Sequence, residues 1–169
     1  MARKGGSVQD GFDLHAKYRL PWDKYGRFTV ESSWANLRSF FIKTGPTDPG
    51  TEYAGYADDG TLPHWRSYST VDWTYKGYGA TLGYTHIPKV ADMEGGFESA
   101  YNVLDLQTRF DLGEVLNPAL AGLSVNLGVN NLTGQNPPLD PNVFGNPPFD
   151  GSAYSPFGRV YYVDLKYKF

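Results

Sequence analysis

Three histidines are the first candidates for chemistry in this sequence. His15, His64 and His86 lie far apart, without the close spacing of metal ligands on one strand or helix. Nothing resembles the strand–turn–helix motif that presents a nucleophilic serine. The chain has no Cys, which excludes thiolate nucleophiles and thiolate metal ligands. We therefore predict no catalytic residue, no metal site and no cofactor, and we expect the protein not to be an enzyme.

Acidic and aromatic side chains share the Gly- and Pro-rich stretches between the more regular segments. Carboxylate oxygens and aromatic rings can contact a ligand, and carboxylates can also bind a divalent cation. Alternatively, these acids are solvated side chains in turns beside Gly and Pro. The same two interpretations apply to Asp140 and Asp150. The candidate ligand-binding residues are Tyr53, Tyr56, Asp58, Asp59, Phe144 and Tyr154.

Two short motifs suggest chemistry that their context does not favour. The glycines of "GYGATLG" have the wrong order for a phosphate loop and no helix follows them, so we expect ordinary strand positions. The "NLT" at Asn131 matches a glycosylation acceptor but falls at the end of an expected strand, and we assign it no modification.

The composition favours β structure. Aromatic residues make up 16% of the chain, Tyr numbers 13 and Met only 2, so residues that favour strands are abundant. The net charge of -3 comes without a basic block, which excludes an electrostatic footprint for nucleic acid. The first residues, "MARKGGSVQDGF", include no apolar segment, so we expect no signal peptide within them.

Apolar and polar residues alternate with period two in seven stretches, which predicts an antiparallel sheet of about seven strands. The second stretch is long, with Phe28, Val30, Trp34, Phe40 and Ile42 in one parity, and Leu37 and Phe41 disturb it as a bulge would. "YKGY" predicts a tight hairpin. The expected strands span residues 12–20, 26–44, 67–75, 78–87, 102–112, 123–132 and 158–169.

The alternation also predicts which residues share a face in the last three strands. One face should carry Leu104, Leu106, Phe110, Leu123, Val125, Leu127, Val163, Leu165 and Tyr167. The other should carry Asp105, Gln107, Arg109, Asn126, Asp164 and Lys166.

Long and short connections alternate along the chain, which places all long loops at one end of an up-and-down sheet. Bacterial outer-membrane barrels have this layout, and their strands average to low hydropathy, as here at -0.46. Tyr and Trp near the strand ends fit interfacial girdles, although these residues also simply favour strands. The fold class we predict is an all-β antiparallel meander that forms part of a transmembrane β-barrel.

The C-terminal motifs carry a family resemblance. "LSVNLGVNNLTGQNPP", a loop and then "GRVYYVDLKYKF" resemble the last two strands of TonB-dependent outer-membrane receptors, and "LPHWRSYSTVDWTYKGYGATLGYTH" is similar to the hairpin before them. The resemblance implies that residues 1–169 are the C-terminal segment of such a barrel, with the plug domain and the TonB box absent from this chain. It also implies that the terminal Phe169 is an assembly signal.

The resemblance further implies location and partners. The chain would lie in the bacterial outer membrane, in contact with lipid and with the remaining barrel and plug portion or another chain, and would meet TonB only through that portion. It would serve uptake of a scarce nutrient such as a ferric siderophore, cobalamin or a saccharide. An odd number of strands disfavours closure by itself. The alternatives are a soluble carbohydrate-binding β-sandwich and a small complete outer-membrane barrel.

Overall fold

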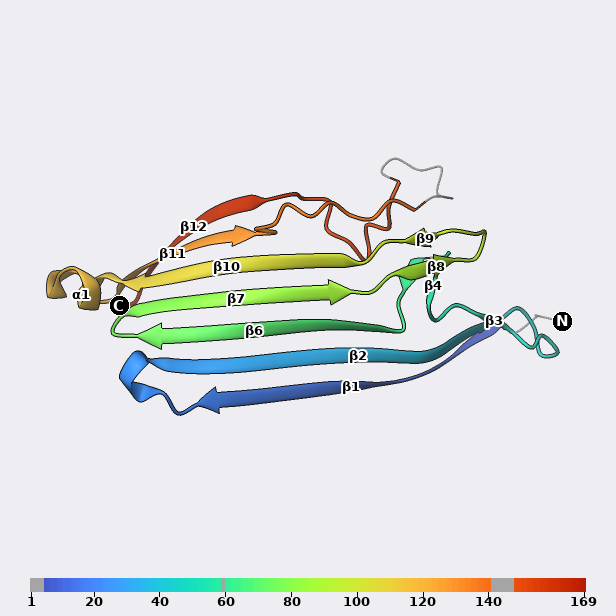
Figure 1. Ribbon diagram of the computed structural model, residues 1–169, viewed down its shortest axis with the longest axis horizontal. Coiled ribbons are helices and arrows are strands. Elements are labelled where there is room, and N and C mark those ends of the chain that lie inside the picture. Colours follow the sequence, from blue (N-terminus) through green and yellow to red (C-terminus); the bar gives the residue numbers. More distant parts are fainter. Residues whose placement is uncertain (1–4, 59, 141–147) are drawn as a thin grey trace.

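A computed structural model describes residues 5–58, 60–140 and 148–169 and shows an antiparallel meander (Figure 1). Strands account for 58% of the chain and helices for 6%, which confirms the predicted all-β class. Seven long strands follow the order β1-β2-β6-β7-β10-β11-β12, and the short β3 pairs with β2. The long strands are β1 (Gly6–Leu20), β2 (Arg27–Lys43), β6 (Trp65–Tyr75), β7 (Tyr78–Ile87), β10 (Tyr101–Asp111), β11 (Leu123–Asn130) and β12 (Val160–Tyr167).

The sheet is open. Each long strand pairs antiparallel with its neighbours in sequence order, and no ladder joins β1 to β12 within the described part of the chain. This arrangement confirms the expectation that the strands do not close on themselves, and it leaves two free edges.

Short connections lie at one end of the sheet, on the left in Figure 1. The β6–β7 hairpin turns at Lys76 and Gly77, whose positive φ angles of 45° and 76° match a type I′ turn. The other two connections contain η1 (Asp23–Tyr25) between β1 and β2, and α1 (Leu112–Val115) with η2 (Pro118–Leu120) between β10 and β11.

Long connections lie at the opposite end, and they contain a second sheet that the sequence did not predict. It has the order β5-β4-β8-β9 and joins the connection after β2 to the connection after β7. Its strands are β4 (Tyr56–Asp58), β5 (Gly60–Leu62), β8 (Val90–Asp92) and β9 (Phe97–Glu98), whereas β3 (Thr51–Glu52) belongs to the large sheet. Such two- and three-residue strands are too short to show an alternation pattern in sequence.

A bulge interrupts the β1–β2 ladder, as the disturbed parity of the second stretch predicted. Asp10 pairs with Ser39 and Gly11 with Leu37, so Arg38 is the extra residue. The bulge corrects one expectation. Each residue of β2 after the bulge points to the opposite face from the one that its parity predicts. Phe41 therefore lies on the same face as Val30 and Trp34, and Phe40 and Ile42 lie on the other.

The small buried core lies between the large sheet and the last long connection. Ile87, Tyr101 and Val103 contribute from β7 and β10, and Tyr154 packs on them with Phe149 and Ala153 nearby. The centre of the large sheet has no second large sheet against it in the described residues, so most of its side chains on one face stay exposed. None of the described residues forms a helix that is long and apolar enough to cross a membrane.

Candidate functional site

The cross-strand register separates charge between the two faces of the large sheet over most of its length. Directly paired residues point to the same side, so Tyr18, Val30, Val71, Leu82, Leu106, Val129 and Tyr161 form one continuous row. We call this side the apolar face. Between the row that contains Phe12 and the row that contains Tyr167, its paired positions include no Asp, Glu, Lys or Arg.

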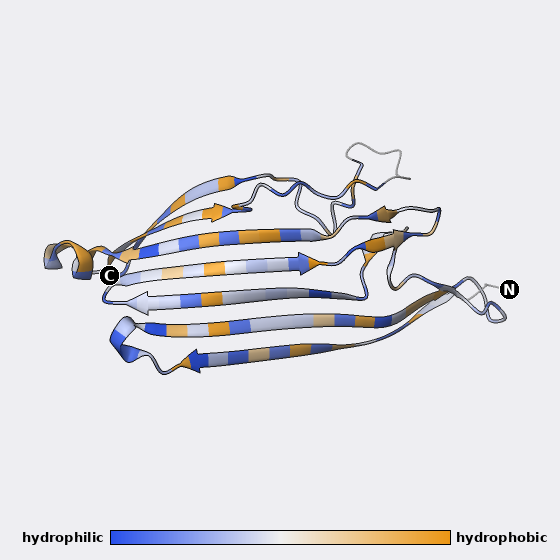
Figure 2. Ribbon diagram, in the orientation of Figure 1, coloured by the Kyte–Doolittle hydropathy of each residue, from blue (hydrophilic) through white to orange (hydrophobic). Residues whose placement is uncertain are grey.

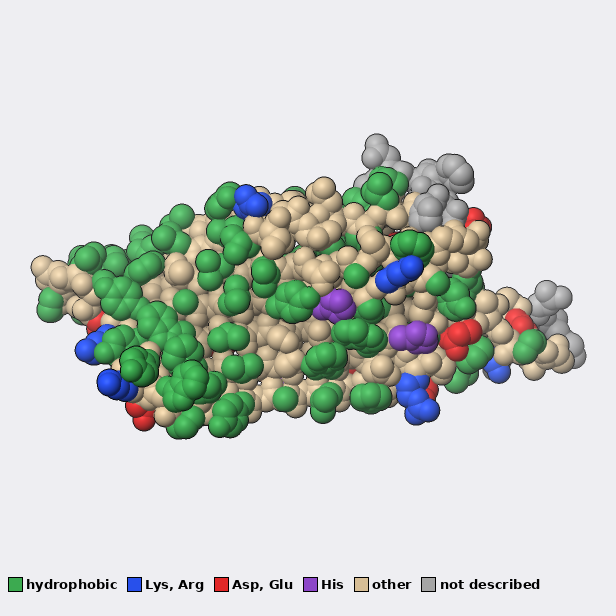
Figure 3. Space-filling model, in the orientation of Figure 1, with side chains coloured by type: hydrophobic (Ala, Val, Ile, Leu, Met, Phe, Trp, Pro, Cys, Tyr) green, Lys and Arg blue, Asp and Glu red, His purple; other side chains and the backbone are tan. Residues whose placement is uncertain are grey.

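The opposite side, the polar face, carries the charged side chains of the same rows. Lys17 pairs with Glu31, with 2.6 Å between Nζ and Oε2, and Asn126 donates to Asp164 at 3.0 Å. Both predicted residue sets of the last three strands therefore lie on opposite faces, as expected. Figure 2 shows the resulting alternation most clearly along β1, β2 and β10, and Figure 3 shows the apolar face, with charged side chains mainly at its margins and at the loop end.

Aromatic side chains concentrate at two levels of the apolar face. Toward the loop end, Trp65 stacks between Trp34 and His86, with ring centroids 5.3 Å and 4.8 Å away. Toward the turn end, Phe28 contacts Trp22 and Trp73. Between these levels the central row of the face is mostly Val and Leu.

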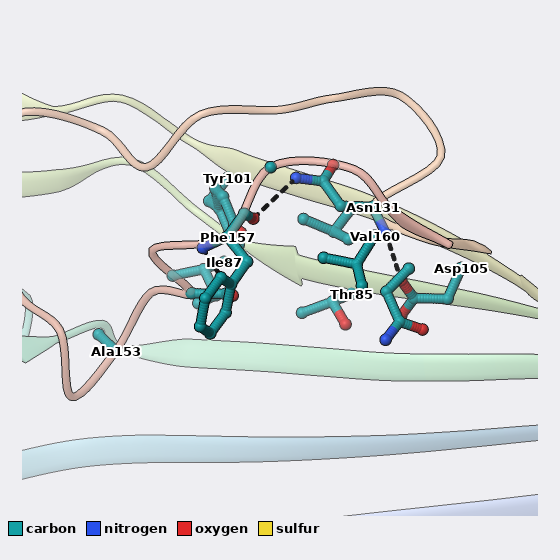
Figure 4. Close-up of a pocket in the computed structure, with 12 residues that line it drawn as sticks. Thr85, Ile87, Tyr101, Asp105, Asn131, Ala153, Phe157 and Val160 are labelled. Atoms are coloured by element: carbon teal, nitrogen blue, oxygen red, sulfur yellow. Dashed lines mark hydrogen bonds between the residues drawn. The ribbon is translucent and has the colours of Figure 1, made fainter. Parts of the chain in front are cut away.

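A cavity of about 560 Å³ lies on the polar face at the loop end. Thr85, Ile87, Tyr101, Val103 and Asp105 form its floor on β7 and β10, and Figure 4 shows Phe157 and Asn131 facing them from the connection between β11 and β12. The walls are mainly apolar, with a few amide, hydroxyl and carboxylate groups. This composition is typical of pockets for small molecules, whose volumes run from roughly 300 to 1,000 Å³.

Asn131 fixes the rim of this cavity. Its backbone N–H donates to Asp105 Oδ1 at 2.7 Å, and its side-chain amide donates to the carbonyl of Gln135 at 2.8 Å and to that of Phe157 at 3.5 Å. The residue is 5% exposed and has a positive φ of 53°, a conformation that Asn tolerates better than most residues. The "NLT" motif thus has a structural role, and its amide is engaged within the protein.

A buried carboxyl group joins the long connections to one another. Glu98 in β9 is fully buried, and its Oε2 accepts hydrogen bonds from Tyr154 Oη at 2.8 Å and from Thr61 Oγ1 at 3.0 Å. Burial raises the pKa of Glu98, these two hydrogen bonds oppose the rise, and Asp140 and Asp150 add to it. Burial, together with the adjacent Glu98, also raises the pKa of Tyr154.

Asp150 holds the start of the segment that carries Tyr154. Its Oδ2 accepts from the backbone N–H of Thr61 at 2.7 Å, and its Oδ1 accepts from the backbone and hydroxyl of Ser152 at 2.8 Å and 2.7 Å. Burial raises the pKa of Asp150, but the hydrogen bonds from Ser152 and Thr61 outweigh it and leave the pKa below its usual value. Asp150 thus stabilises its own turn through Ser152 and also links this segment to Thr61 in the connection after β2.

The predicted ligand-binding residues divide between several positions. Tyr56, 37% exposed, and the backbone of Asp58 lie in β4 of the second sheet, β5-β4-β8-β9, which we call the loop sheet. Tyr53 is half-buried just before β4. Tyr154 is 2% exposed in the core, where only a rearranged loop would offer it to a ligand. Asp59 and Phe144 lie outside the described residues. The terminal Phe169 is fully exposed, with its ring 5.0 Å from that of Tyr167.

The three histidines occupy separate places. His15 lies on the polar face beside Ser33, His64 lies at the start of β6, where its Nδ1 is 3.0 Å from the Leu37 carbonyl, and His86 belongs to the aromatic stack. Among residues 5–58, 60–140 and 148–169, no group of three or more His, Asp or Glu side chains is placed to hold a metal ion.

The sequence reasoning missed Glu98 and Asn131. Glu98 stands in "GGFESA", where nothing marks it as buried, because its partners Thr61 and Tyr154 are 37 and 56 residues away. Asn131 follows a strand and precedes Gly134 and two prolines, which is a turn signal that could have indicated a capping role. Comparison with protein-family models, with curated proteins and with solved structures finds no match to this chain.

Proposed function

We propose that this chain is a segment of a bacterial outer-membrane β-barrel, in which the apolar face contacts lipid and the polar face lines the lumen. The single observation that carries the proposal is the absence of Asp, Glu, Lys and Arg from the apolar face at the paired positions between the row of Phe12 and the row of Tyr167. A charge on the lipid face costs about 2–4 kcal/mol at the bilayer midplane. A water-exposed sheet face is under no such constraint.

The size of the apolar face supports the same proposal. Trp65 and Tyr75 begin and end β6, ten residues apart on this face. At about 3.3 Å per residue the distance is roughly 33 Å along the strand, and a tilt of about 40° reduces it to roughly 25 Å along the membrane normal. Outer-membrane barrels have an apolar band about 25 Å tall with aromatic girdles at both margins.

The free edges supply a further argument. Outer strands β1 and β12 each leave a row of backbone N–H and C=O groups without a strand partner among the described residues. In hydrocarbon each unsatisfied group costs several kcal/mol, so an open sheet is not viable there. We therefore propose that both edges pair with strands from a larger barrel, supplied by a longer protein or by another chain.

Within such a barrel, we propose a role in TonB-dependent uptake of a scarce nutrient, such as a ferric siderophore, cobalamin or a saccharide. The proposal rests on the sequence resemblance, on the gathering of all long connections at one end, and on the cavity that these connections form with the polar face. The exposed Tyr56 would meet an incoming ligand first, and energy coupling would require a plug domain inside the barrel.

Cysteine scanning tests the membrane placement directly, because the chain has no Cys of its own. Single replacements Leu106→Cys, Leu127→Cys and Val163→Cys lie on the apolar face, and Gln107→Cys and Arg109→Cys lie on the polar face. In intact outer membranes, a water-soluble maleimide should label the polar-face set and spare the apolar-face set until detergent is added.

Two outcomes would contradict the proposal. Equal labelling of both sets before detergent is added would show that the apolar face does not contact lipid. Recovery of the protein in the soluble fraction of the cells that make it would favour a soluble carbohydrate-binding protein, whose exposed aromatic rows would stack on sugar rings.

A further inference from the structure

The three long connections converge at the loop end of the sheet, and we call their described residues within 44–64, 88–100 and 131–159 the loop cap. In Figure 1 the labels β4, β8 and β9 mark the place where the first two meet. The third reaches this place through Asp150 and Tyr154, whose partners are Thr61 and Glu98. Each of the three connections thus contributes one side chain to a single cluster around the Glu98 carboxyl group.

The two oxygens of Glu98 differ sharply in their surroundings. Oε2 accepts from a hydroxyl of each of the other two connections, whereas Oε1 is buried without a hydrogen-bond partner, the one such side-chain atom found in the described residues. A buried ionised carboxylate with an unpaired oxygen is strongly unfavourable. In the neutral carboxyl group Oε2 is the carbonyl oxygen that accepts both hydroxyls, Oε1 carries the proton, and no charge is buried.

The electrostatic surroundings favour the neutral form as well. Asp140 and Asp150, both from the third connection, are the charged groups that act on Glu98, and both are acidic. From β8 the residue opposite Glu98 in the ladder is the apolar Val90, and Thr61 of β5 contributes only a hydroxyl. Ionisation would therefore place a negative charge close to those of Asp140 and Asp150, and this repulsion favours the neutral form.

We propose that Glu98 is a proton-operated latch, which holds the three connections of the loop cap together while its carboxyl group is neutral and loosens them when it ionises. The proposal goes beyond uptake and does not depend on the membrane placement, because it rests only on contacts within the loop cap. Its consequence is that access to Tyr154 and to the cavity beside it depends on pH.

The sign of the dependence follows from the direction of the pKa shift. In an open cap Glu98 returns toward its usual pKa of 4.5, whereas in the closed cap its pKa is higher. The closed cap therefore binds more protons than the open cap between the two values, and closure weakens as pH rises through this interval. Below the usual pKa of 4.5 the neutral carboxyl group stabilises the closed cap fully. Above the raised pKa of the closed cap, the stability of this cap does not fall further with pH.

Backbone hydrogen exchange of the full chain in detergent micelles tests the latch. Exchange rates are corrected for their intrinsic pH dependence, and peptides from residues 88–98 and 148–157 are compared with peptides from β7 and β10 between pH 5 and pH 9. Protection of the loop cap should fall with rising pH, by about tenfold for each unit by which closure raises the pKa. Protection of the sheet should stay constant, which separates opening of the cap from global unfolding.

Three variants make the test specific. Glu98→Gln cannot ionise and should keep the loop cap protected at every pH. Tyr154→Phe removes a donor that stabilises the ionised form, so the fall in protection should move to higher pH. Glu94→Gln is the matched control, an exposed acid in the same connection, and should behave as the wild type.

Protection that does not change with pH in the wild type would overturn the latch. A Glu98→Gln variant with the same pH dependence as the wild type would also overturn it, since another group would then be responsible. If Glu98→Gln does not fold, the Tyr154→Phe variant still tests the proposal. A pH midpoint for the fall in protection that is unchanged or lower than in the wild type would contradict it.

Discussion

The carboxylate of Asp105, within β10, accepts the backbone N–H of Asn131 at 2.7 Å at the point where β11 ends. This bond directs the chain out of the sheet and over the polar face, so that Phe157 comes to lie across the cavity from Thr85 and Ile87 (Figure 4). The contact connects a strand position on the polar face with the long connection that covers the cavity.

Replacing Asn131 with Ala should destabilise the protein by about 1–3 kcal/mol. The change removes three side-chain hydrogen bonds at a buried position, to Gln135 twice and to Phe157 once, and places Ala at a positive φ. The free energy of unfolding in urea gives the measurement. Asn136→Ala, at an exposed neighbour, is the control, and a loss of similar size there would refute the special role of Asn131.

An arginine at Leu106 should cost about 2–4 kcal/mol when the protein is folded in lipid vesicles. Leu106 lies in the central row of the apolar face, between Leu82 and Val129. The neighbouring Gln107→Arg should change stability little, because this residue points to the polar face. Equal costs for the two variants would argue against a lipid-facing apolar side.

Deletion of Phe169 should reduce assembly in cells without a comparable loss of stability. The ring is fully exposed and contacts only Tyr167 among the ring pairs of the described chain, so its removal costs little packing. The assembly effect follows from the family resemblance of the C-terminus. The fraction of protein inserted in the outer membrane is measured against Lys168→Ala, which keeps the terminal ring. Normal insertion of the deletion variant would exclude a signal role.

The β6–β7 hairpin should respond in opposite directions to changes at its two turn residues. Gly77→Ala places a Cβ at φ 76° and only 2.7 Å from the Glu114 Cβ, and should cost about 1–2 kcal/mol. Lys76→Asn puts a residue favoured in type I′ turns at φ 45° and should preserve or slightly raise stability. Thermal unfolding of both variants checks the turn type, and a stabilising Gly77→Ala would show it to be wrong.

The turn that follows β2 should loosen only in strong acid. Hydrogen bonds to the Asp48 carboxylate, from the hydroxyl and backbone of Thr44 and from the backbone of Gly50, lower the pKa of Asp48 to about 2. A lowered pKa stabilises the turn above the usual value of 3.8, and the effect is lost as pH falls through about 2. The amide proton shift of Thr44 should titrate with this midpoint, whereas a midpoint near 4 would contradict the hydrogen bonds.

Local sequence determined the seven long strands, the sharp hairpin at Lys76 and Gly77, and the two faces of the last three strands. These features depend on the period-two alternation of a strand and on turn chemistry within four residues, and both can be read along the chain. The same alternation predicted the bulge near Leu37. The face of Phe40 and Ile42 was assigned wrongly, because a single extra residue reverses every side chain that follows it.

Tertiary structure alone decided the loop sheet and the buried cluster around Glu98. Segments of two or three residues carry no period, and they form strands here only because connections from different parts of the chain meet at one end of the sheet. The burial of Glu98 likewise depends on Thr61 and Tyr154, which the chain brings from 37 residues before it and 56 residues after it. A hydrogen bond across such separations forms only once the large sheet has placed the connections side by side, which is why no local pattern marks it.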